Sequence, residues 1–203
     1  MIGINKEVNF ISMKKIFLFV VLYFPLLAAL GQGVFTDPRD SSVYKTMTMG
    51  NITWMVENLR YKFSTGTNYF DNDPSNYLPY GALYDWKTAI KVCPDKWHLP
   101  NGPEFQKLID HLDQTGSWKS GPSDKNSFGI QLGGMQDYEG TFTEMNESAY
   151  FWTSTEYDNE NAEYFSYIVV VKTPVADISR KDDIQDIHGT EKTNKYSVRC
   201  VKN

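Results

Sequence analysis

Two cysteines and three histidines are the side chains of this chain with the widest range of chemistry. Cys93 and Cys200 are the only cysteines, no CxxC spacing occurs, and His98 is the only histidine near either of them. Structural zinc sites need four such ligands, commonly in closely spaced pairs, so this pattern does not favour a metal centre. His98 is interpreted as a core contact at the start of a helix, whereas His111 and His188 fall on polar segments. None of the three is interpreted as a catalytic base, and we do not expect an enzyme.

Carboxylates are the other candidates for chemistry. A glycosidase needs two of them about 5 to 10 Å apart in a cleft, and among 25 acidic residues some pair meets that distance by chance. Asp71 and Asp73, with Asn76, faintly resemble a calcium loop, but no bidentate glutamate or glycine follows at the EF-hand spacing. The run from Tyr69 to Tyr77 is dense in turn-forming residues, so a turn-rich loop is the favoured interpretation. Asp71 and Asp73 stay weak metal candidates, structural calcium is left open, and no cofactor is predicted.

The N-terminal residues predict export. Met13-Lys14-Lys15 precedes an apolar run from Ile16 to Leu30, and small residues lead to Gly31, which is the order of a signal peptide. The apolar run is about 15 residues long, shorter than the roughly 20 that span a bilayer. We therefore expect residues 1–31 to be an upstream extension plus a signal peptide, with no transmembrane segment after cleavage. The exported chain is expected to be secreted, periplasmic or on the cell surface.

Composition limits the partners and the covalent structure. The net charge is -5, both signs are mixed along the chain, and no basic stripe is present that would follow phosphates. Nucleic acid is therefore not an expected partner. Two cysteines in an exported chain most simply form one disulfide, here between Cys93 and Cys200. Aromatic residues make up 15% of the chain, which fits either a loop-rich core or a recognition surface.

About 170 residues remain after the signal peptide, which is the length of one domain. We expect a flexible polar lead-in at 32–42 and a single domain at 43–203. Two helices are predicted in that domain. The first, at 84–92, ends before Cys93-Pro94 because proline disfavours helix in the preceding residue. The second follows Asn101, where Glu104 completes a capping box and apolar residues recur at helical spacing.

The remaining elements are predicted as strands and loops. The strands are 43–48 and 52–58 as a hairpin, 128–132 ended by Gly133-Gly134, 149–154, 164–171 and 196–201. Phe151 and Trp152 are expected to point in opposite directions, one into the core and one outward. A polar stretch covers 172–195. The chain is therefore expected to be α+β, with mixed, mostly antiparallel sheets, two helices, long irregular loops and one disulfide.

Five ordered blocks between about residues 43 and 202 resemble the Fibrobacter succinogenes major paralogous domain family. The blocks are Asn51 to Leu59, Asp73 to Asn76 with Tyr80 to Trp86, Cys93 to Pro100, Trp152 to Glu156, and Ser197 to Val201. The spacing of Trp86, Ala89 and Cys93, with Cys200 in the last strand, is also similar to the framework of the C-type lectin-like fold. The resemblance implies that fold, with Trp54, Trp86, Ala89, Trp97 and Trp152 as framework residues.

The chain departs from the families that it resembles at several functional motifs. The family usually has Gly-Gly-Tyr/Phe-Arg where this chain has Gly133-Gly134-Met135-Gln136, so a contact made by that arginine is not expected. The motifs by which true C-type lectins hold calcium and sugar, Glu-Pro-Asn or Gln-Pro-Asp followed by Trp-Asn-Asp, do not occur. Formylglycine-generating oxidases resemble the chain around Leu99 to Phe105. They need reactive cysteines, and a disulfide would leave no thiolate here.

The lectin-like resemblance implies a binding site on the long-loop face. The candidate residues on that face are Gln136, Asp137, Tyr138, Glu156, Tyr157 and Asp158. Aromatic rings stack on sugars or become buried in protein partners, and carboxylates and amides bind hydroxyls. We therefore expect a non-catalytic module that binds an extracellular glycan or protein. The alternative is a structural or adhesive component of a surface assembly, with pairing edges at 32–42 and 164–171; an oxidase-like enzyme is less favoured.

Overall fold

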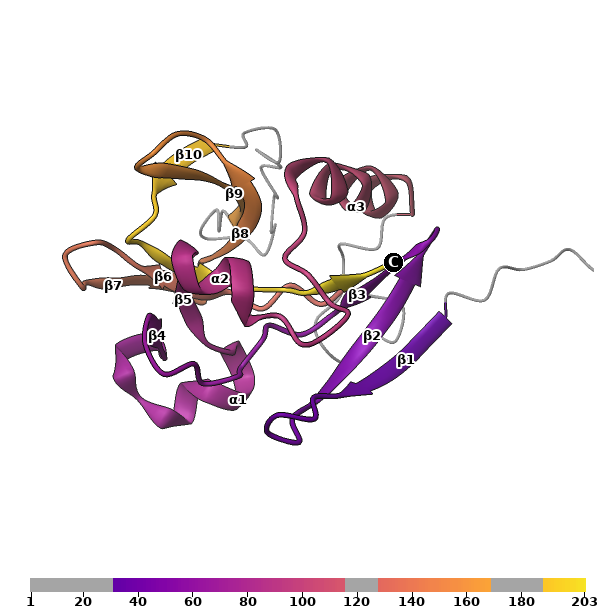
Figure 1. Ribbon diagram of the computed structural model, residues 1–203, viewed down its shortest axis with the longest axis horizontal. Coiled ribbons are helices and arrows are strands. Elements are labelled where there is room, and N and C mark those ends of the chain that lie inside the picture. Colours follow the sequence, from indigo (N-terminus) through magenta and orange to yellow (C-terminus); the bar gives the residue numbers. More distant parts are fainter. Residues whose placement is uncertain (1–30, 116–127, 169–187) are drawn as a thin grey trace, which may run out of the picture.

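The computed structural model describes residues 31–115, 128–168 and 188–203, which form two sheets with helices packed against them (Figure 1). The smaller sheet has the strand order β1-β2-β3-β12. The larger sheet has the order β10-β9-β8-β6-β11-β5-β4, with β7 paired to β6. The pairings β6–β8 and β11–β8 are parallel, and the other pairings found are antiparallel. The predicted α+β class with mixed, mostly antiparallel sheets is confirmed.

The smaller sheet joins the two ends of the described chain. It contains β1 (Gly31–Thr36), β2 (Val43–Met49), β3 (Ile52–Met55) and β12 (Val201–Lys202). The predicted hairpin is confirmed, because β2 pairs with β3 from Met49 opposite Ile52. The prediction of a flexible lead-in at 32–42 is wrong for its first half. All six residues of β1 pair with β2 without a register shift, and Asp37 just after the strand is fully buried.

The larger sheet holds most of the second half of the domain. Its strands are β4 (Thr67–Asn68), β5 (Leu83–Asp85), β6 (Gly133–Gln136), β7 (Phe142–Met145), β8 (Ser148–Glu156), β9 (Asn161–Ile168), β10 (His188–Glu191) and β11 (Lys195–Ser197). The strand predicted at 128–132 is absent, and Gly133-Gly134 begins β6 instead of ending a strand. Gly134 has φ +61, and a Cβ there would lie 2.3 Å from the Thr143 carbonyl oxygen, so glycine permits the close approach of β7. Residues 169–171 of the last long predicted strand lie outside the described residues.

The helices are α1 (Tyr77–Tyr80), α2 (Trp86–Val92) and α3 (Gly102–Thr115), and two 3-10 turns, η1 (Phe70–Asn72) and η2 (Pro74–Asn76), precede α1. Side chains cap the N-termini of the two longer helices, α2 and α3. The helix predicted from residue 84 starts two residues later, because the Asp85 carboxylate accepts a hydrogen bond from Thr88 N at 2.8 Å. The capping box of α3 is confirmed. Asn101 Oδ1 accepts from Glu104 N, and Glu104 Oε2 accepts from Asn101 N, both at 2.9 Å.

One correction concerns the number of helices. The segment predicted as a loop at 69–77 is built from the 3-10 turns and the first residue of α1, so the prediction of two helices misses the short α1. Within the described ranges, no helix combines the length and the apolar character needed to span a bilayer.

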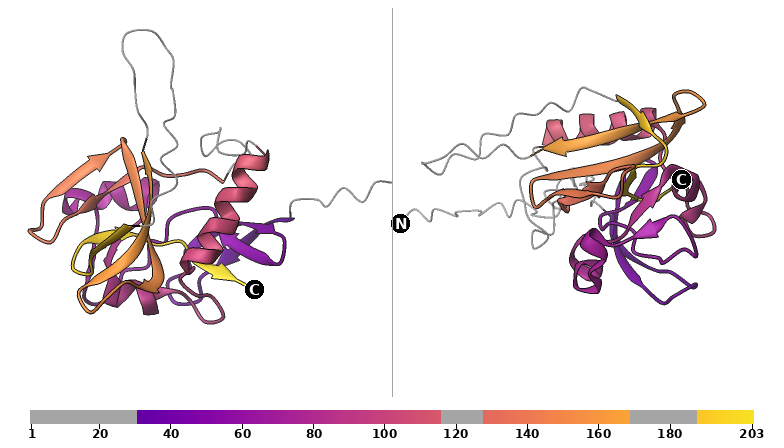
Figure 2. Two further views of the ribbon diagram at one scale, coloured as in Figure 1. Left: turned by 90° about the horizontal axis from the view of Figure 1, so that it is seen from above. Right: turned by 90° about the vertical axis from the view of Figure 1, so that its left-hand side faces the viewer.

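Two core clusters lie on either side of β8. One surrounds Trp152, with Tyr84, Tyr196 and Ala89, and the other contains Phe151, with residues of β3 and α3. Phe151 and Trp152 are 1% and 0% exposed, so the prediction that one of them faces outward is wrong. Both directions from this strand lead into packed protein, since α3 contacts β8 and β9 (Figure 2). The framework residues Trp54, Ala89 and Trp152 are buried, and Trp86 and Trp97 are partly buried and pack against the first cluster.

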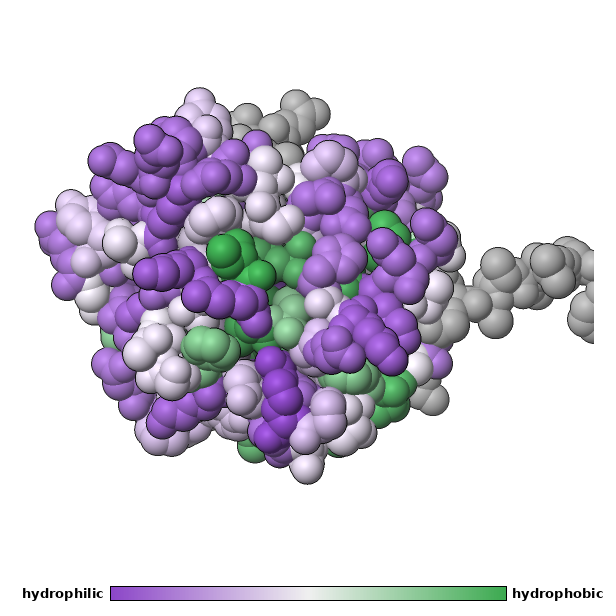
Figure 3. All heavy atoms as spheres, viewed as in Figure 1, coloured by the Kyte–Doolittle hydropathy of each residue, from purple (hydrophilic) through white to green (hydrophobic). Residues whose placement is uncertain are grey.

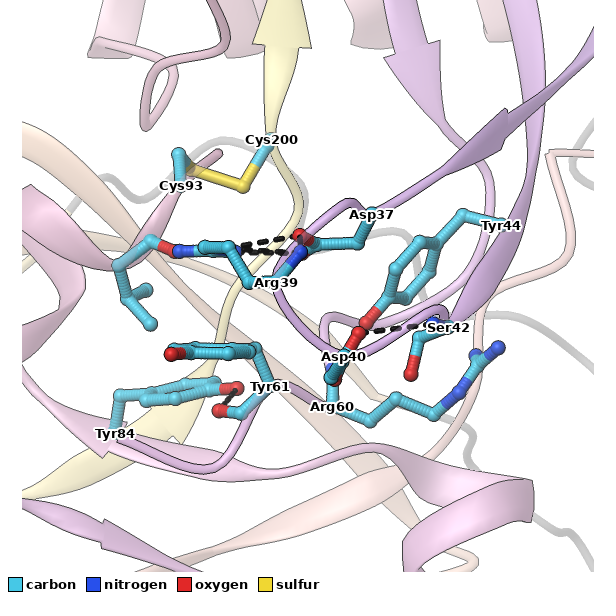
Figure 4. Close-up of polar contacts among 11 residues, drawn as sticks. Asp37, Arg39, Asp40, Ser42, Tyr44, Arg60, Tyr61, Tyr84, Cys93 and Cys200 are labelled. Carbon is cyan, nitrogen blue, oxygen red and sulfur yellow. Dashed lines mark hydrogen bonds and ion pairs between the residues drawn. A yellow bond between two sulfur atoms is a disulfide. The ribbon is translucent and has the colours of Figure 1, made fainter. Parts of the chain in front are cut away.

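The predicted disulfide is confirmed and lies in the first core cluster. Cys93, just after α2, is bonded to Cys200, just before β12. Next to it, Arg39 donates from Nη1 to the Val92 carbonyl oxygen at 2.8 Å and forms an ion pair with Asp37 at 2.6 Å (Figure 4). The Arg39 guanidinium also lies 3.9 Å from the centre of the Tyr61 ring. These contacts fix the β1–β2 connection to the end of α2.

Arg199, the neighbour of Cys200, is a fully buried cation. Its guanidinium donates to Asn58 Oδ1 at 3.0 Å and to the carbonyl oxygens of Phe128 and Gly129 at 2.9 and 2.6 Å. Burial lowers the pKa of Arg199 to about 9. The side chain therefore holds residues 128–129, which belong to no strand, against the segment that joins β11 to β12.

Candidate functional site

Five of the six candidate binding residues lie in two hairpin turns or at the end of the strand that leads into one of them. The β6–β7 turn contains Asp137 and Tyr138, and the β8–β9 turn contains Tyr157 and Asp158, with Glu156 at the end of β8. Both turns lie in the left part of the molecule in Figure 1. We call residues 137–141 and 156–160 the hairpin-tip face.

The two aspartates of this face build the turns. Asp137 Oδ1 accepts a hydrogen bond from Thr141 N at 2.8 Å. Asp158 Oδ1 accepts from Glu160 N at 2.8 Å and from Asn161 N at 2.7 Å, and the Asn161 amide reaches both carboxylate oxygens at 3.0 Å. The hydrogen bond from the Asn161 side chain, with those from the backbone, lowers the pKa of Asp158. These carboxylates have a structural role, which limits their capacity to bind a ligand directly.

Lys192, which follows β10, ties the β8–β9 turn to the rest of the sheet. Its Nζ donates to Glu156 Oε1 at 2.5 Å, to the Asp158 carbonyl oxygen at 2.6 Å and to the Asn159 carbonyl oxygen at 2.9 Å. The ammonium lies 4.9 Å from the centre of the Trp86 ring. Glu156 is therefore neutralised within the face. Sequence reasoning missed Lys192, because nothing in a polar segment of the sequence shows which turn its lysines will reach.

Gln136 lies beneath the face and is not available to a ligand, since it is only 6% exposed. Its Nε2 donates to the Gly140 carbonyl oxygen at 2.9 Å, and its Oε1 accepts from Lys195 Nζ at 2.9 Å. The Asn68 amide lies 2.6 Å from the same Oε1. Burial lowers the pKa of Lys195, and the charge of Asp85 opposes that shift. This half-buried network supports the β6–β7 turn from below.

Four of the six candidate residues are exposed to solvent, namely Tyr138, Glu156, Tyr157 and Asp158, and the two tyrosines are the aromatic ones among them. They are 62% and 65% exposed, each directly beside a turn-building aspartate. The Tyr157 ring lies against Gly189 of β10, where an added Cβ would come within 2.9 Å of ring atoms. One side of that ring is therefore supported by backbone. The two tyrosines are the groups on this face that can offer aromatic surface to a ligand.

The contact between Glu144 and Tyr150 was also not found from the sequence. Glu144 in β7 has φ +64, a conformation that non-glycine residues rarely adopt, and its Oε2 accepts from the Tyr150 hydroxyl at 2.6 Å. Burial and this carboxylate raise the pKa of Tyr150 well above its ordinary value. Tyr150 stacks on Tyr196 with ring centres 5.2 Å apart, and Tyr164 lies 5.1 Å from Tyr196. Backbone strain of this kind is invisible in a residue pattern.

The other candidates for chemistry have local structural roles. Asp73 caps η2 by accepting from Ser75 N at 2.8 Å, and that backbone hydrogen bond lowers its pKa. Asp71, with φ +54, lies in the preceding 3-10 turn. His98 Nε2 lies 3.0 Å from Glu104 Oε1, so it contacts the cap of α3. In the part of the chain that the structure describes, no group of three or more histidine, cysteine, aspartate or glutamate side chains is arranged to hold a metal ion.

Comparison with protein families settles the relationship suggested by the sequence blocks. The family model of the Fibrobacter succinogenes major domain matches residues 47–202. The chain belongs to this family. Comparisons with curated proteins and with solved structures give no match. The matched range begins within β2 and extends into β12, so it includes both hairpin turns and the disulfide.

Proposed function

We propose that this member of the Fibrobacter succinogenes major domain family is an exported, non-catalytic binding module of C-type lectin-like fold. It recognises an extracellular glycan or protein through the hairpin-tip face. The lectin-like fold is supported by the strands from both ends of the domain in one sheet and by the disulfide that ties α2 to the last strand. The disulfide also fits an oxidising compartment outside the cytosol.

The observation that carries this proposal is the pair of exposed tyrosines on two braced turns. Tyr138 and Tyr157 are about two-thirds exposed, whereas Asp137 and Asp158 beside them are held by hydrogen bonds within their own turns. Tyrosine has few rotatable bonds, so a ring on a fixed turn loses little conformational entropy when a ligand stacks on it. This combination is typical of recognition surfaces.

The charges of the face restrict the chemistry of the ligand. The segments 136–141, 156–161 and 191–195 contain the acidic residues Asp137, Glu139, Glu156, Asp158, Glu160 and Glu191 and two basic residues, Lys192 and Lys195. Lys192 is bonded to three oxygens of the β8–β9 turn, and Lys195 is half-buried on Gln136. An anionic ligand would therefore meet net negative charge. An uncharged glycan fits better, because its apolar ring faces stack on tyrosine and it adds no negative charge to the face.

A glycan array tests this proposal, with the oxidised chain applied in calcium and then in chelator, at low and at high salt. We expect selective binding to uncharged glycans that persists in chelator and changes little with salt, since stacking and hydroxyl hydrogen bonds need no ion and are weakly screened. Binding that disappears in chelator would instead indicate a calcium-dependent lectin. Binding to no glycan at all would contradict the glycan form of the proposal and shift attention to protein partners.

A further inference from the structure

The outer edge of β1 differs from the other sheet edges of the molecule. β1 lies at one end of the smaller sheet and pairs only with β2 among the described strands (Figure 1). An edge strand presents unpaired N–H and C=O groups that can accept another strand. Gln32, Gly33, Val34 and Thr36 are exposed along this edge, and Val34 is 68% exposed.

Natural sheets protect their edges with short strands, charges, prolines or bulges, and the other edges here have such features. β4 and β12 are two residues long. β10 is four residues long and ends in Glu191. β7 contains the backbone irregularity at Glu144. β1 has none of these features, because it is six residues long, contains no charged residue or proline, and pairs with β2 in continuous register.

We propose that this edge is an interaction surface for a second copy of the chain, with the two β1 strands paired antiparallel about a two-fold axis. An uncharged strand can lie opposite its own copy without like-charge repulsion, and Gly33 presents no side chain at the junction. Two-fold pairing uses both edges, so it forms a closed dimer and not a filament. The surface lies on β1 and does not include the hairpin turns, so the inference is independent of the proposed ligand site.

Sedimentation analysis of the oxidised chain from about 10 to about 500 µM tests the dimer, because association follows mass action. We expect the mass to rise toward twice the monomer value. Val34→Lys places a charge at the edge and should weaken association at least about tenfold, whereas Val34→Thr, which keeps a β-branched uncharged side chain, should retain it. Leu78→Lys is the matched control, since Leu78 is 71% exposed on α1 and should not matter.

Amide hydrogen exchange then locates the contact. Residues 31–36 should become more protected as the protein concentration rises, and residues 137–141 should not change. A chain that stays monomeric over the whole range would overturn the proposal. Equal association of the Val34→Lys and Leu78→Lys variants, or concentration-dependent protection elsewhere than β1, would overturn it as well.

Discussion

Replacing Cys93 and Cys200 by alanine should remove a large share of the stability of the domain. The bridge closes a loop across a sequence separation of 107 residues, for which the chain-entropy model gives about 4.8 kcal/mol at 25 °C. Domains of this size are usually stable by about 5–15 kcal/mol. The double variant is therefore expected to be folded but marginal.

Contacts around the bridge should keep the folded state close to its present form without the disulfide. Met55 N donates to the Cys200 carbonyl oxygen at 3.0 Å, and His98 and Val201 exchange backbone hydrogen bonds at 2.8 and 2.9 Å. Arg39 holds the Val92 carbonyl independently of the sulfur atoms. Most of the effect should therefore come from a less restricted unfolded chain.

Equilibrium urea unfolding, followed by circular dichroism, measures this loss. The double variant should lose about 4–5 kcal/mol in free energy of unfolding, and the wild type in reductant should lose a similar amount. The urea dependence of the unfolding free energy should become steeper, because a chain without a cross-link exposes more surface when it unfolds. A loss below about 1.5 kcal/mol would refute the entropic reasoning.

Three further predictions concern single buried groups. Arg199→Leu removes the donor to two buried oxygens and one partly buried oxygen and should cost at least about 3 kcal/mol in urea unfolding. Gly134→Ala should cost about 2 kcal/mol or more by the same assay, because the residue has φ +61 and its Cβ would collide with the Thr143 carbonyl oxygen; an unchanged midpoint would contradict the close approach of β7. Burial raises the pKa of Tyr196 to about 12, so the unfolded chain loses this proton at a lower pH than the folded protein does. The contribution of Tyr196 to the free energy of unfolding is therefore present below about pH 10 and is lost as the pH rises to about 12. The free energy of unfolding of the wild type relative to Tyr196→Phe should therefore decrease by about 2–3 kcal/mol over that interval. A constant difference would show that the hydroxyl is not buried as described. The titration of Arg199 is common to both proteins and cancels from the comparison.

Local sequence rules predicted the parts of the fold that depend on neighbouring residues. The capping box at Asn101 and Glu104 and the hairpin before Met55 are of this kind. The disulfide spans 107 residues and was predictable only because the chain has two cysteines. The strand at β8 was predicted, but the expectation that Phe151 or Trp152 faces outward was wrong. β8 lies between two core clusters, so both faces of the strand are buried. The assignment of 128–132 failed because Arg199, 70 residues away in sequence, fixes that segment through its carbonyl groups.

The candidate site was predicted only in outline. Tyr138 and Tyr157 were predicted to lie on a long-loop face, and in the structure they lie in hairpin turns and are exposed. The carboxylates of Asp137 and Asp158 accept hydrogen bonds from backbone N–H groups of their own turns. The sequence could not show this, since it depends on the turn conformation. Lys192 reaches Glu156 across 36 residues of sequence, and no spacing rule anticipates that contact.

The surface of the molecule offers other apolar side chains against which the tyrosines can be compared. Figure 3 shows apolar residues gathered near the middle of one face among hydrophilic ones. Exposed apolar residues away from the hairpin turns include Ile90 of α2 at 46% and Leu78 of α1 at 71%. Substitution of Leu78 therefore controls for the general loss of exposed apolar surface.

The measurement that tests the central claim most directly compares three proteins on the same glycan array: the wild type, the Tyr138→Ala/Tyr157→Ala variant and the Leu78→Ala variant. Both tyrosines are exposed, so the double variant should keep its unfolding midpoint close to that of the wild type. We predict that it loses binding to the glycans that the wild type selects, whereas Leu78→Ala binds as the wild type does. Equal binding by all three proteins would contradict a role of the hairpin-tip face in recognition.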